Sequence, residues 1–401
     1  MTSGFQAEAR RARWAVAAMF AANGFTMVAW APQIPLILPR LGISETTLGL
    51  MILGLGVGAV GAMLFAGRLI ARFGSRAVLR VFGLSVIPVI PAVVFSHNLP
   101  LTTLAMMLFG AMAGCMDVSM NAQAVAIERR LGRAIMSSSH GFWSLGGFVG
   151  GSAGAWVIAQ AGAEAQALAA AAGAALLVFG AMPFLLPDPP AAPVAGATAP
   201  RGRLLPRDAG LWLLGFMALF SMVPEGAVLD WAALYLAKEL DADLFRSGLA
   251  FAFFAGTMAI MRFAGDGVRN RFGAVATLRL SGLIGAAGLM GGALAPNDAV
   301  AIVSFAFAGL GVANMVPILF SAAGNHPGLP PGQAISVVTM VGYAGILVAP
   351  ASIGYVAEHL GFRLTYGAVA VLLVAVALLA GRAARADELH HPAGPQTSPA
   401  T

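Results

Sequence analysis

Asp117 and Asn121 lie in the middle of an otherwise apolar run that extends over residues 99–127. In a helix, residues four positions apart share one face, so the carboxyl group and the amide would lie side by side. An ionisable group at membrane depth costs roughly 2.5–3.5 kcal/mol on insertion scales, which makes it a candidate functional group. Asp117 is therefore a candidate for proton uptake and release. The alternative is a carboxyl group paired permanently with a helix neighbour for packing.

Two further acids, Glu225 and Asp230, lie in the apolar run over 209–236. Glu225 follows Pro224, which removes a backbone hydrogen bond and is expected to break or kink a helix. Freed carbonyl groups beside a carboxylate suit the recognition of a polar ligand, and Glu225 is also a candidate for proton coupling. The alternative for Glu225 is a carboxyl group satisfied locally at a bend. The alternative for Asp230 is an interfacial residue at an outer gate.

The other polar residues inside apolar runs are few and are candidates to line a site for a polar ligand. The candidates for substrate binding are Asn23, Gln33, Asn121, Glu225, Asp230, Asn314 and Tyr343. His140 could transfer protons, but it lies one or two turns from the start of its run, beside three serines, and a structural role is the preferred interpretation. His326, His390 and His391 provide no ligand set for a metal. Without a phosphate loop or a nucleophile elbow, the sequence predicts neither an enzyme nor a bound cofactor.

The chain around these residues is strongly apolar. Of 401 residues, 59% are hydrophobic and 10% are charged, whereas a soluble domain carries about 25% charged residues. A membrane-spanning helix needs about 20 mostly apolar residues, and this length predicts an all-α membrane protein with twelve transmembrane helices. The predicted spans are 14–38, 46–68, 77–96, 99–127, 134–160, 164–186, 209–236, 244–265, 275–295, 298–324, 333–357 and 361–381.

The positive charges alternate with these spans. If the N-terminus is cytoplasmic, 19 of the 23 Lys and Arg residues, Arg262 among them, fall on the cytoplasmic side and 4 fall outside. This positive-inside bias predicts a multi-pass protein of the bacterial inner membrane with both termini in the cytoplasm. Because the arginines are spread over many short segments, they form no nucleic-acid-binding patch despite the net charge of +6.

The two halves of the chain repeat one another. Ala66–Gly67 recurs as Ala264–Gly265, and Ala134–Ile135 as Ala334–Ile335, about 200 residues later in each case. A parallel repeat of six spans is typical of transporters in which two bundles move about a central site. We therefore expect an N-terminal six-helix bundle over 1–186, a Pro- and Ala-rich cytoplasmic linker over 187–208, a C-terminal six-helix bundle over 209–384 and a disordered cytoplasmic tail over 385–401.

A motif of five residues resembles the loop signature of the major facilitator superfamily, between helices two and three. It consists of Gly67, Leu69, Arg72, Gly74 and Arg76. Within that superfamily, the stretches 114–121, 137–147 and 224–231 resemble the fucose-permease-like group of bacterial transporters. The resemblance implies that helices 1, 4, 7 and 10 line a central cavity. It also implies a role in proton coupling for the acid at position 117, because fucose–proton symporters similarly carry an acid there and an asparagine four residues later.

The resemblance further assigns gating residues to two cytoplasmic loops, between helices 2–3 and helices 8–9. The candidates are Gly67, Arg72, Gly74 and Arg76 in the first loop and Asp266 and Arg271 in the second. The superfamily signature has an aspartate where this chain has Ala71. In the resembled fold, the second loop faces the start of helix 5, here residues 137–139, whose N–H groups lack partners within the helix. We expect Asp266 to bind this helix end only when the cytoplasmic side is closed. A permanent Asp266–arginine pair is the alternative.

These observations predict a secondary active transporter that acts as a monomer in the lipid bilayer by alternating access. Its expected partners are a small-molecule substrate and protons, and the preferred mode is proton-coupled symport of a small polar metabolite, with sugars among the candidates. A proton-driven exporter of drugs or metabolites is the main alternative, and a transport-dead sensor or scaffold is another. Methionines lining the cavity would favour export, and the candidates are Met27, Met116, Met120, Met222 and Met315.

Overall fold

The structure is a computed structural model that describes residues 2–187 and 205–388, and every regular element in these ranges is a helix. The first range holds α1 (Thr2–Ala29), η1 (Ala31–Gln33), α2 (Ile34–Leu41), α3 (Glu45–Phe73), α4 (Ser75–Ser85), α5 (Val89–Val94), α6 (Leu99–Leu131), α7 (Met136–Ala181) and η2 (Met182–Phe184). The second range holds α8 (Ala209–Glu239), α9 (Leu244–Phe272), α10 (Ala274–Ala293), α11 (Asp298–Val312), α12 (Met315–Gly324), α13 (Pro331–Leu360), α14 (Phe362–Leu378) and η3 (Ala380–Asp387).

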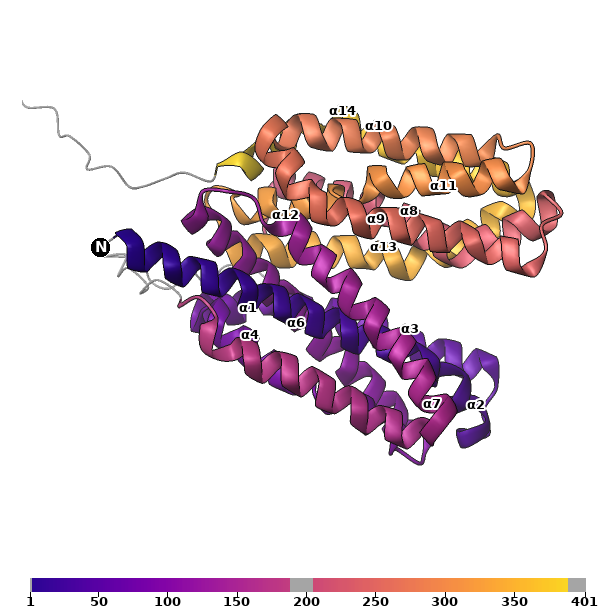
Figure 1. Ribbon diagram of the computed structural model, residues 1–401, viewed down its shortest axis with the longest axis horizontal. Helices are drawn as coiled ribbons and strands as arrows, with labels where there is room; N and C mark the ends of the chain where they lie inside the picture. The colour runs from indigo at the N-terminus through magenta and orange to yellow at the C-terminus, as the bar shows by residue number, and fades with distance from the viewer. Residues whose placement is uncertain (1, 188–204, 389–401) are drawn as a thin grey trace, which may run out of the picture.

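The helices form two bundles that lie side by side (Figure 1). Elements α1 to η2 make the N-terminal bundle, and elements α8 to η3 make the C-terminal bundle. The bundles meet at the end where α1 begins and η3 lies, and they diverge toward the other end (Figure 1). We call these the proximal end and the distal end. Contacts between the bundles run mainly through α3 with α13 and through α7 with α9.

By length and composition, the described residues contain ten helical segments that could cross a membrane, or eleven if the bent pair of α14 and η3 counts as one span. One of the ten, Met136–Phe184, is 49 residues long and covers most of both the fifth and the sixth predicted spans. Gly162 interrupts it with a φ of +88°. The difference from twelve predicted spans therefore arises largely because two spans are joined in one continuous segment.

The chain reverses direction at Gly162. Near this residue, at the distal end, Gln33 donates a hydrogen bond to the backbone oxygen of Ala163 at 2.8 Å. Near the C-terminal end of this segment, the Arg80 guanidinium on α4 donates a hydrogen bond to the backbone oxygen of Met182 at 2.9 Å. Because glycine adopts a positive φ without steric cost, one residue is enough for the turn.

Polar residues and glycines set the helix boundaries. Side chains at the N-caps accept hydrogen bonds from the first turns of α3, α6, α8, α9 and α11; they belong to Ser44, Asn98, Asp208, Asp243 and Asn297. Gly74 separates α3 from α4 with a φ of +82°, and Gly273 separates α9 from α10 with a φ of +80°. The repeated sequence of the two halves therefore produces the same sharp link at equivalent places.

Several predicted boundaries differ from the structure. The predicted loops between helices 2–3 and 8–9 are short, since α3 continues to Phe73 and α9 to Phe272. Both helices continue until a glycine with positive φ ends them, and the arginines within their last turns do not disrupt the helix. Pro224 does not break helix 7, because α8 runs from Ala209 to Glu239 with the proline inside. The break occurs in helix 10 instead, between Val312 and Met315.

The C-terminal boundary also differs from its prediction. The tail was expected to begin at residue 385, but residues 385–387 belong to η3, in which Ala380, Ala383 and Ala386 are fully buried. Residues 389–401, and residues 188–204 of the predicted linker, lie outside the described part of the chain. The bundle fold therefore includes η3, which packs against α10 and α12.

Large apolar side chains cover the outer faces of both bundles. Phe148, Trp156 and Leu176 on α7, Ile260 on α9 and Leu378 on α14 are each more than 60% exposed. Exposed apolar surface of this extent is stable in contact with lipid and unfavourable in water. The exterior is therefore that of an integral membrane protein, in which polar side chains are concentrated between the helices.

Candidate functional site

Asp117 and Asn121 lie on consecutive turns of α6. The Asn121 amide donates a hydrogen bond to the backbone oxygen of Asp117 at 2.9 Å. Only 3% of Asp117 is exposed, and its Oδ2 atom has no hydrogen-bond partner within the described chain. Tyr343 on α13, in the opposite bundle, interacts with the carboxyl group through a side-chain hydrogen bond. The acid predicted to carry the proton therefore lies at a contact between the two bundles.

His140 on α7 continues this polar chain. Its Nε2 atom lies 3.3 Å from Oδ1 of Asn121. Its ring lies between Phe20 of the same bundle and Phe320 of the C-terminal bundle, with ring centroids 5.1 and 5.8 Å away. The sequence favoured a purely structural histidine near the end of its helix. In the structure, His140 is one hydrogen bond away from Asn121 and lies at the contact between the bundles.

Arg262 on α9 joins the two bundles at the same level. Its Nη1 atom donates a hydrogen bond to Ser144 on α7 at 2.6 Å, and its Nη2 atom lies 3.4 Å from Oε2 of Glu225 on α8. The Arg262 side chain is 8% exposed, whereas the Glu225 side chain is 37% exposed. The alternation of charges groups Arg262 with the arginines of the cytoplasmic side, but in the structure its side chain is buried between the bundles. Because α9 extends ten residues further, Arg262 lies roughly 15 Å inside the helix end.

Tyr343 connects these groups electrostatically. It interacts with Asp117 of the N-terminal bundle and with Glu225 and Arg262 of the C-terminal bundle. We call these four residues the central cluster. It contains two carboxyl groups and one guanidinium, so one carboxyl group has no cationic partner in the cluster. This imbalance can be removed by a bound proton or by a ligand that donates hydrogen bonds.

Two of the predicted substrate-binding residues lie inside the N-terminal bundle with their own partners. Asn23 donates to the backbone oxygen of Ala113 at 3.1 Å and accepts from the Trp143 indole at 2.9 Å. Gln33 is 1% exposed and donates to Gln166 as well as to Ala163 at the distal end. These contacts join α1 and η1 to α6 and α7. Asn23 and Gln33 therefore stabilise the bundle and are not part of the central cluster.

Asp230 and Asn314 also lie apart from the cluster. Asp230 is exposed near the distal end of α8. Asn314 is fully buried at the break between α11 and α12, and neither polar atom of its amide has a partner among the described residues. Its amide packs against the backbone of Gly265, where an added Cβ would lie 1.8 Å from Oδ1. Of the seven predicted substrate-binding residues, the structure brings together Asn121, Glu225 and Tyr343, with Asp117 between them.

At the proximal end, five consecutive backbone N–H groups at the start of α7 are bound by side chains. Asp266 accepts from Ser137 at 2.9 Å and from Ser138 at 3.1 Å. Asn270 accepts from the N–H of Ala134 at 2.8 Å. Glu128 accepts from those of Ile135 and Met136 at 2.9 and 3.0 Å. Asp266 and Asn270 belong to α9, so the opposite bundle supplies three of these five bonds. The Asp266 carboxylate also interacts favourably with the positive end of the α7 helix dipole.

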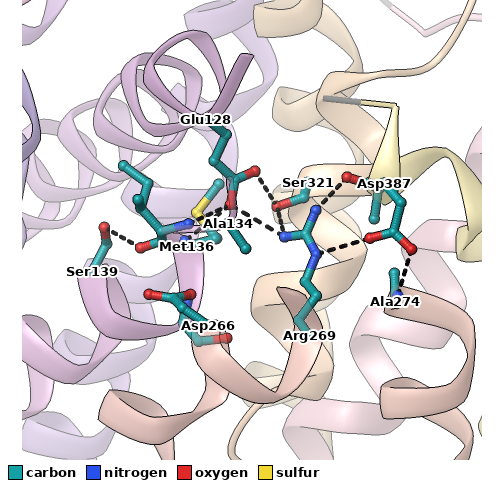
Figure 2. A network of polar contacts seen from close by, with 12 residues as sticks. Glu128, Ala134, Met136, Ser139, Asp266, Arg269, Ala274, Ser321 and Asp387 are labelled. Atoms are coloured by element: carbon teal, nitrogen blue, oxygen red, sulfur yellow. Dashed lines mark hydrogen bonds and ion pairs between the residues drawn. The ribbon is translucent and has the colours of Figure 1, made fainter. Parts of the chain in front are cut away.

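Arg269 links the same region to the C-terminal end of the fold (Figure 2). Its guanidinium is 2% exposed, lies 3.1 Å from Glu128 and donates to Ser321 at 2.9 Å. On its other side it lies 3.4 Å from Asp387, which also accepts from the backbone N–H of Ala274 at 2.6 Å. We call the set of Glu128, Asp266, Arg269, Asn270, Ser321 and Asp387 the closing network. It connects α6 and α7 to α9, α12 and η3.

The first half contributes close packing at this end. A Cβ added at Gly67 would lie 2.7 Å from the Gln333 Cα, so only glycine permits this approach of α3 to α13. Arg72 and Arg271 are exposed, and each lies over the phenylalanine that follows it, at 5.1 and 5.4 Å. Arg76 is half-buried near the start of α4. Gly67 and Asp266 thus contact the opposite bundle, whereas Arg72 and Arg271 lie on the surface.

Comparison with known proteins identifies the family. The model of the Major Facilitator Superfamily matches residues 14–331. An uncharacterised MFS-type transporter of Yersinia pestis is 34% identical over 363 residues, which cover 88% of this chain and 91% of that protein. The chain belongs to the major facilitator superfamily. It is a membrane transporter and not an enzyme.

Two solved structures share the fold of this superfamily member. The fucose:proton symporter FucP of E. coli superposes with a TM-score of 0.74 at 16% identity, covering 92% of this chain and 97% of FucP. FucP in the outward conformation gives a TM-score of 0.77 at 15% identity, with the same coverage. The resemblance to the fucose-permease-like group, seen in the sequence, is thus confirmed for the fold.

The transporter contains functional candidates that its sequence did not reveal. Arg262, Glu128 and Arg269 follow no local motif, and their partners lie far away in the chain: Glu128 and Arg269 are 141 residues apart. Met116, Met120 and Met315 are fully buried in packed helices, so they do not line an open surface. Within residues 2–187 and 205–388, no group of three His, Cys, Asp or Glu side chains is arranged to hold a metal ion.

Proposed function

We propose that this transporter is a proton-coupled symporter of a small polar metabolite, with sugars as the first candidates. The observation that carries the proposal is the position of the Asp117 carboxyl group, buried at the contact between the bundles, with Tyr343 as its polar neighbour there and Oδ2 without a partner in the described chain. Such a carboxyl group can bind a proton without breaking an ion pair. Asp117 is the proton-coupling residue in this mechanism, with Glu225 as the second acid.

Coupling follows from the contact between α6 and α13. When the bundles move relative to one another, Tyr343 leaves Asp117, and an ionised carboxylate would lose its hydrogen-bond donor. The free energy of the bundle movement therefore depends on whether a proton is bound, and by linkage proton affinity depends on the arrangement of the bundles. The negative charge of Glu225 is partly neutralised by Arg262, which lies 3.4 Å from that carboxylate in the same bundle.

The chemistry of the central cluster favours a ligand that both donates and accepts hydrogen bonds. Tyr343 and Arg262 are donors, whereas Asp117 and the half-exposed Glu225 are acceptors. Hydroxyl groups match both kinds, and a polyhydroxylated substrate adds no charge to a cluster that already carries two acids. FucP is a fucose:proton symporter, and its similarity in fold supports the same class of reaction here. Asn121 and His140 lie beside the cluster as further polar groups for substrate.

The orientation in the membrane rests on charge. With Arg262 placed inside the membrane, eighteen arginines remain on the predicted cytoplasmic side against four cations outside. We therefore assign the proximal end to the cytoplasm of a bacterial cell and propose an inner-membrane monomer with both termini inside. The closing network then closes the cytoplasmic side, which corresponds to an outward-facing state.

The test is substrate-driven proton flux. The full chain is reconstituted in liposomes that contain a pH-sensitive dye, and neutral sugars, polyols, amino acids and organic acids are added one at a time. We expect at least one polyhydroxylated compound to drive proton movement in its own direction, and Asp117→Asn to abolish that movement. Proton movement opposite to the substrate, or substrate accumulation that is indifferent to the proton gradient, would refute symport and favour the exporter.

A further inference from the structure

A basic pocket lies on the N-terminal bundle at the proximal end, separate from the central cluster. Its volume is about 460 Å³, and it is lined by Gln6, Arg10, Arg13, Trp14, Leu131 and Arg133. All three charged residues of this lining are cations. A concave site with several guanidinium groups is suited to a phosphate group, which accepts several hydrogen bonds from them.

The contacts of Arg13 show that this pocket can accept more negative charge. Its Nη2 atom donates to Ser138 at 2.6 Å, but its buried Nη1 atom has no hydrogen-bond partner among the described residues. Arg13 and Arg133 lie close enough to repel one another, and Asp266 is the acid that acts on Arg13 from the opposite bundle. A bound anion would reduce the repulsion and provide the missing acceptor.

An apolar groove adjoins the basic pocket. Its volume is about 520 Å³, and it lies between α1 and the end of α7 with η2, where its lining includes Trp14, Ala18, Leu176, Gly180 and Phe184. Trp14 lines both cavities, and the residue is 64% exposed. Leu176 and Phe184 are 77% and 52% exposed, so the groove opens on the lipid-facing side of the bundle.

We propose that the basic pocket and the apolar groove together bind one anionic glycerophospholipid, with its phosphate among Arg10, Arg13 and Arg133 and an acyl chain in the groove beside Trp14. Tryptophan is enriched at the level of lipid headgroups, and basic pockets beside membrane helices bind anionic headgroups. Free phosphate would use the basic pocket alone. The joined apolar groove is therefore the observation that favours a lipid.

The experiment is a lipid titration of the purified full-length protein in neutral detergent, followed by native mass spectrometry. The probes are phosphatidylglycerol and phosphatidylcholine. We expect phosphatidylglycerol to bind about tenfold more tightly than phosphatidylcholine, and R10Q/R133Q to remove most of this preference. The matched control is R279Q/R382Q, which removes two exposed arginines at the proximal end of the C-terminal bundle. If the control loses the preference for phosphatidylglycerol to the same extent, the preference arises from overall positive charge and the proposed lipid site is wrong.

A second variant separates lipid from free phosphate. A Cβ added at Gly180 would meet no atom within 4 Å, and this residue lines the groove, so Gly180→Phe is the change chosen to fill it. We expect this variant to weaken phosphatidylglycerol binding about fivefold and to leave the binding of inorganic phosphate unchanged. If Gly180→Phe has no effect, or if inorganic phosphate binds as tightly as the lipid, the pocket is a phosphate site and the lipid proposal is wrong.

Discussion

The carboxylate of Asp266 on α9 accepts hydrogen bonds from the backbone N–H groups of Ser137 and Ser138, at 2.9 and 3.1 Å, and so binds the first turn of a helix in the opposite bundle. A carboxylate at a helix N-terminus gains about 0.3–1 kcal/mol from the helix dipole, and more where it is partly buried. The two elements belong to different bundles. The contact therefore requires that the proximal end is closed.

Asp266→Asn is expected to lower the population of the state in which this end is closed. The amide keeps one acceptor oxygen but loses the charge, and hydrogen bonds to charged groups contribute about 1.5–3 kcal/mol. We expect a shift of about tenfold, measured in membranes by crosslinking Arg129→Cys to Asn325→Cys with a short bis-maleimide. The Arg129 guanidinium donates to the Asn325 side chain at 2.7 Å, so the two positions face one another across the bundles when this end is closed.

The matched control for this crosslinking experiment is Asp230→Asn, which removes an exposed acid from the same bundle. It should crosslink as the unmodified chain does. Equal crosslinking in the Asp266→Asn variant would mean that Asp266 does not distinguish the closed from the open arrangement. A permanent contact that only fixes the shape of the helix ends would then be the better interpretation.

Asp117→Asn is predicted to separate transport from proton coupling. Asparagine has nearly the same size and can keep a hydrogen bond with Tyr343, but it cannot exchange a proton. We expect uphill uptake to fall at least about tenfold, while exchange of labelled substrate across the membrane continues. Uptake and exchange are measured in the same proteoliposomes at several external pH values. Uphill transport at the unmodified rate would exclude Asp117 as the coupling residue.

The Arg262–Glu225 pair can be tested by a double-mutant cycle. Arg262→Gln alone removes the cation beside Glu225 and alters the bond to Ser144, so the thermal unfolding midpoint in detergent should fall. The double variant with Glu225→Gln should fall by less than the sum of the single variants. Since Glu225 is 37% exposed, solvent weakens the pair, and we expect a coupling of about 1 kcal/mol. Additive losses would show that the two groups act independently.

Asn23→Ala is predicted to affect stability and not substrate affinity. The change removes the hydrogen bonds to Ala113 and Trp143 in a buried region and leaves those groups without this partner. The expected cost is about 1–3 kcal/mol in the free energy of unfolding. Asn121→Ala serves as the comparison. Because Asn121 adjoins Asp117, this variant should reduce transport while the amount of protein in the membrane stays similar. A selective loss of substrate affinity in Asn23→Ala would contradict this assignment.

Hydrophobic run length was sufficient to predict that the chain is helical and crosses the membrane many times, because each span needs about 20 mostly apolar residues. The i,i+4 spacing was sufficient to place Asp117 beside Asn121. Run length could not reveal that Gln33 would find Gln166 or that Arg262 would lie beside Glu225, because these pairs depend on how helices pack. An arginine near a predicted helix end has the same local sequence whether it lies in a loop or, like Arg262, nearly three turns inside the helix.

Glu128 is fully buried, and its ionic partner Arg269 lies 141 residues further along the chain. At roughly 5–20 residues per second, the ribosome needs roughly 7–28 s to add those residues. The N-terminal bundle, which ends at η2, is complete before Arg269 is added, and until then it holds a carboxylate without its ionic partner and a helix start that lacks three of its five acceptors. The order of synthesis therefore makes docking of the two bundles the last step of assembly, and the first bundle must wait for the second before its own helix ends are satisfied.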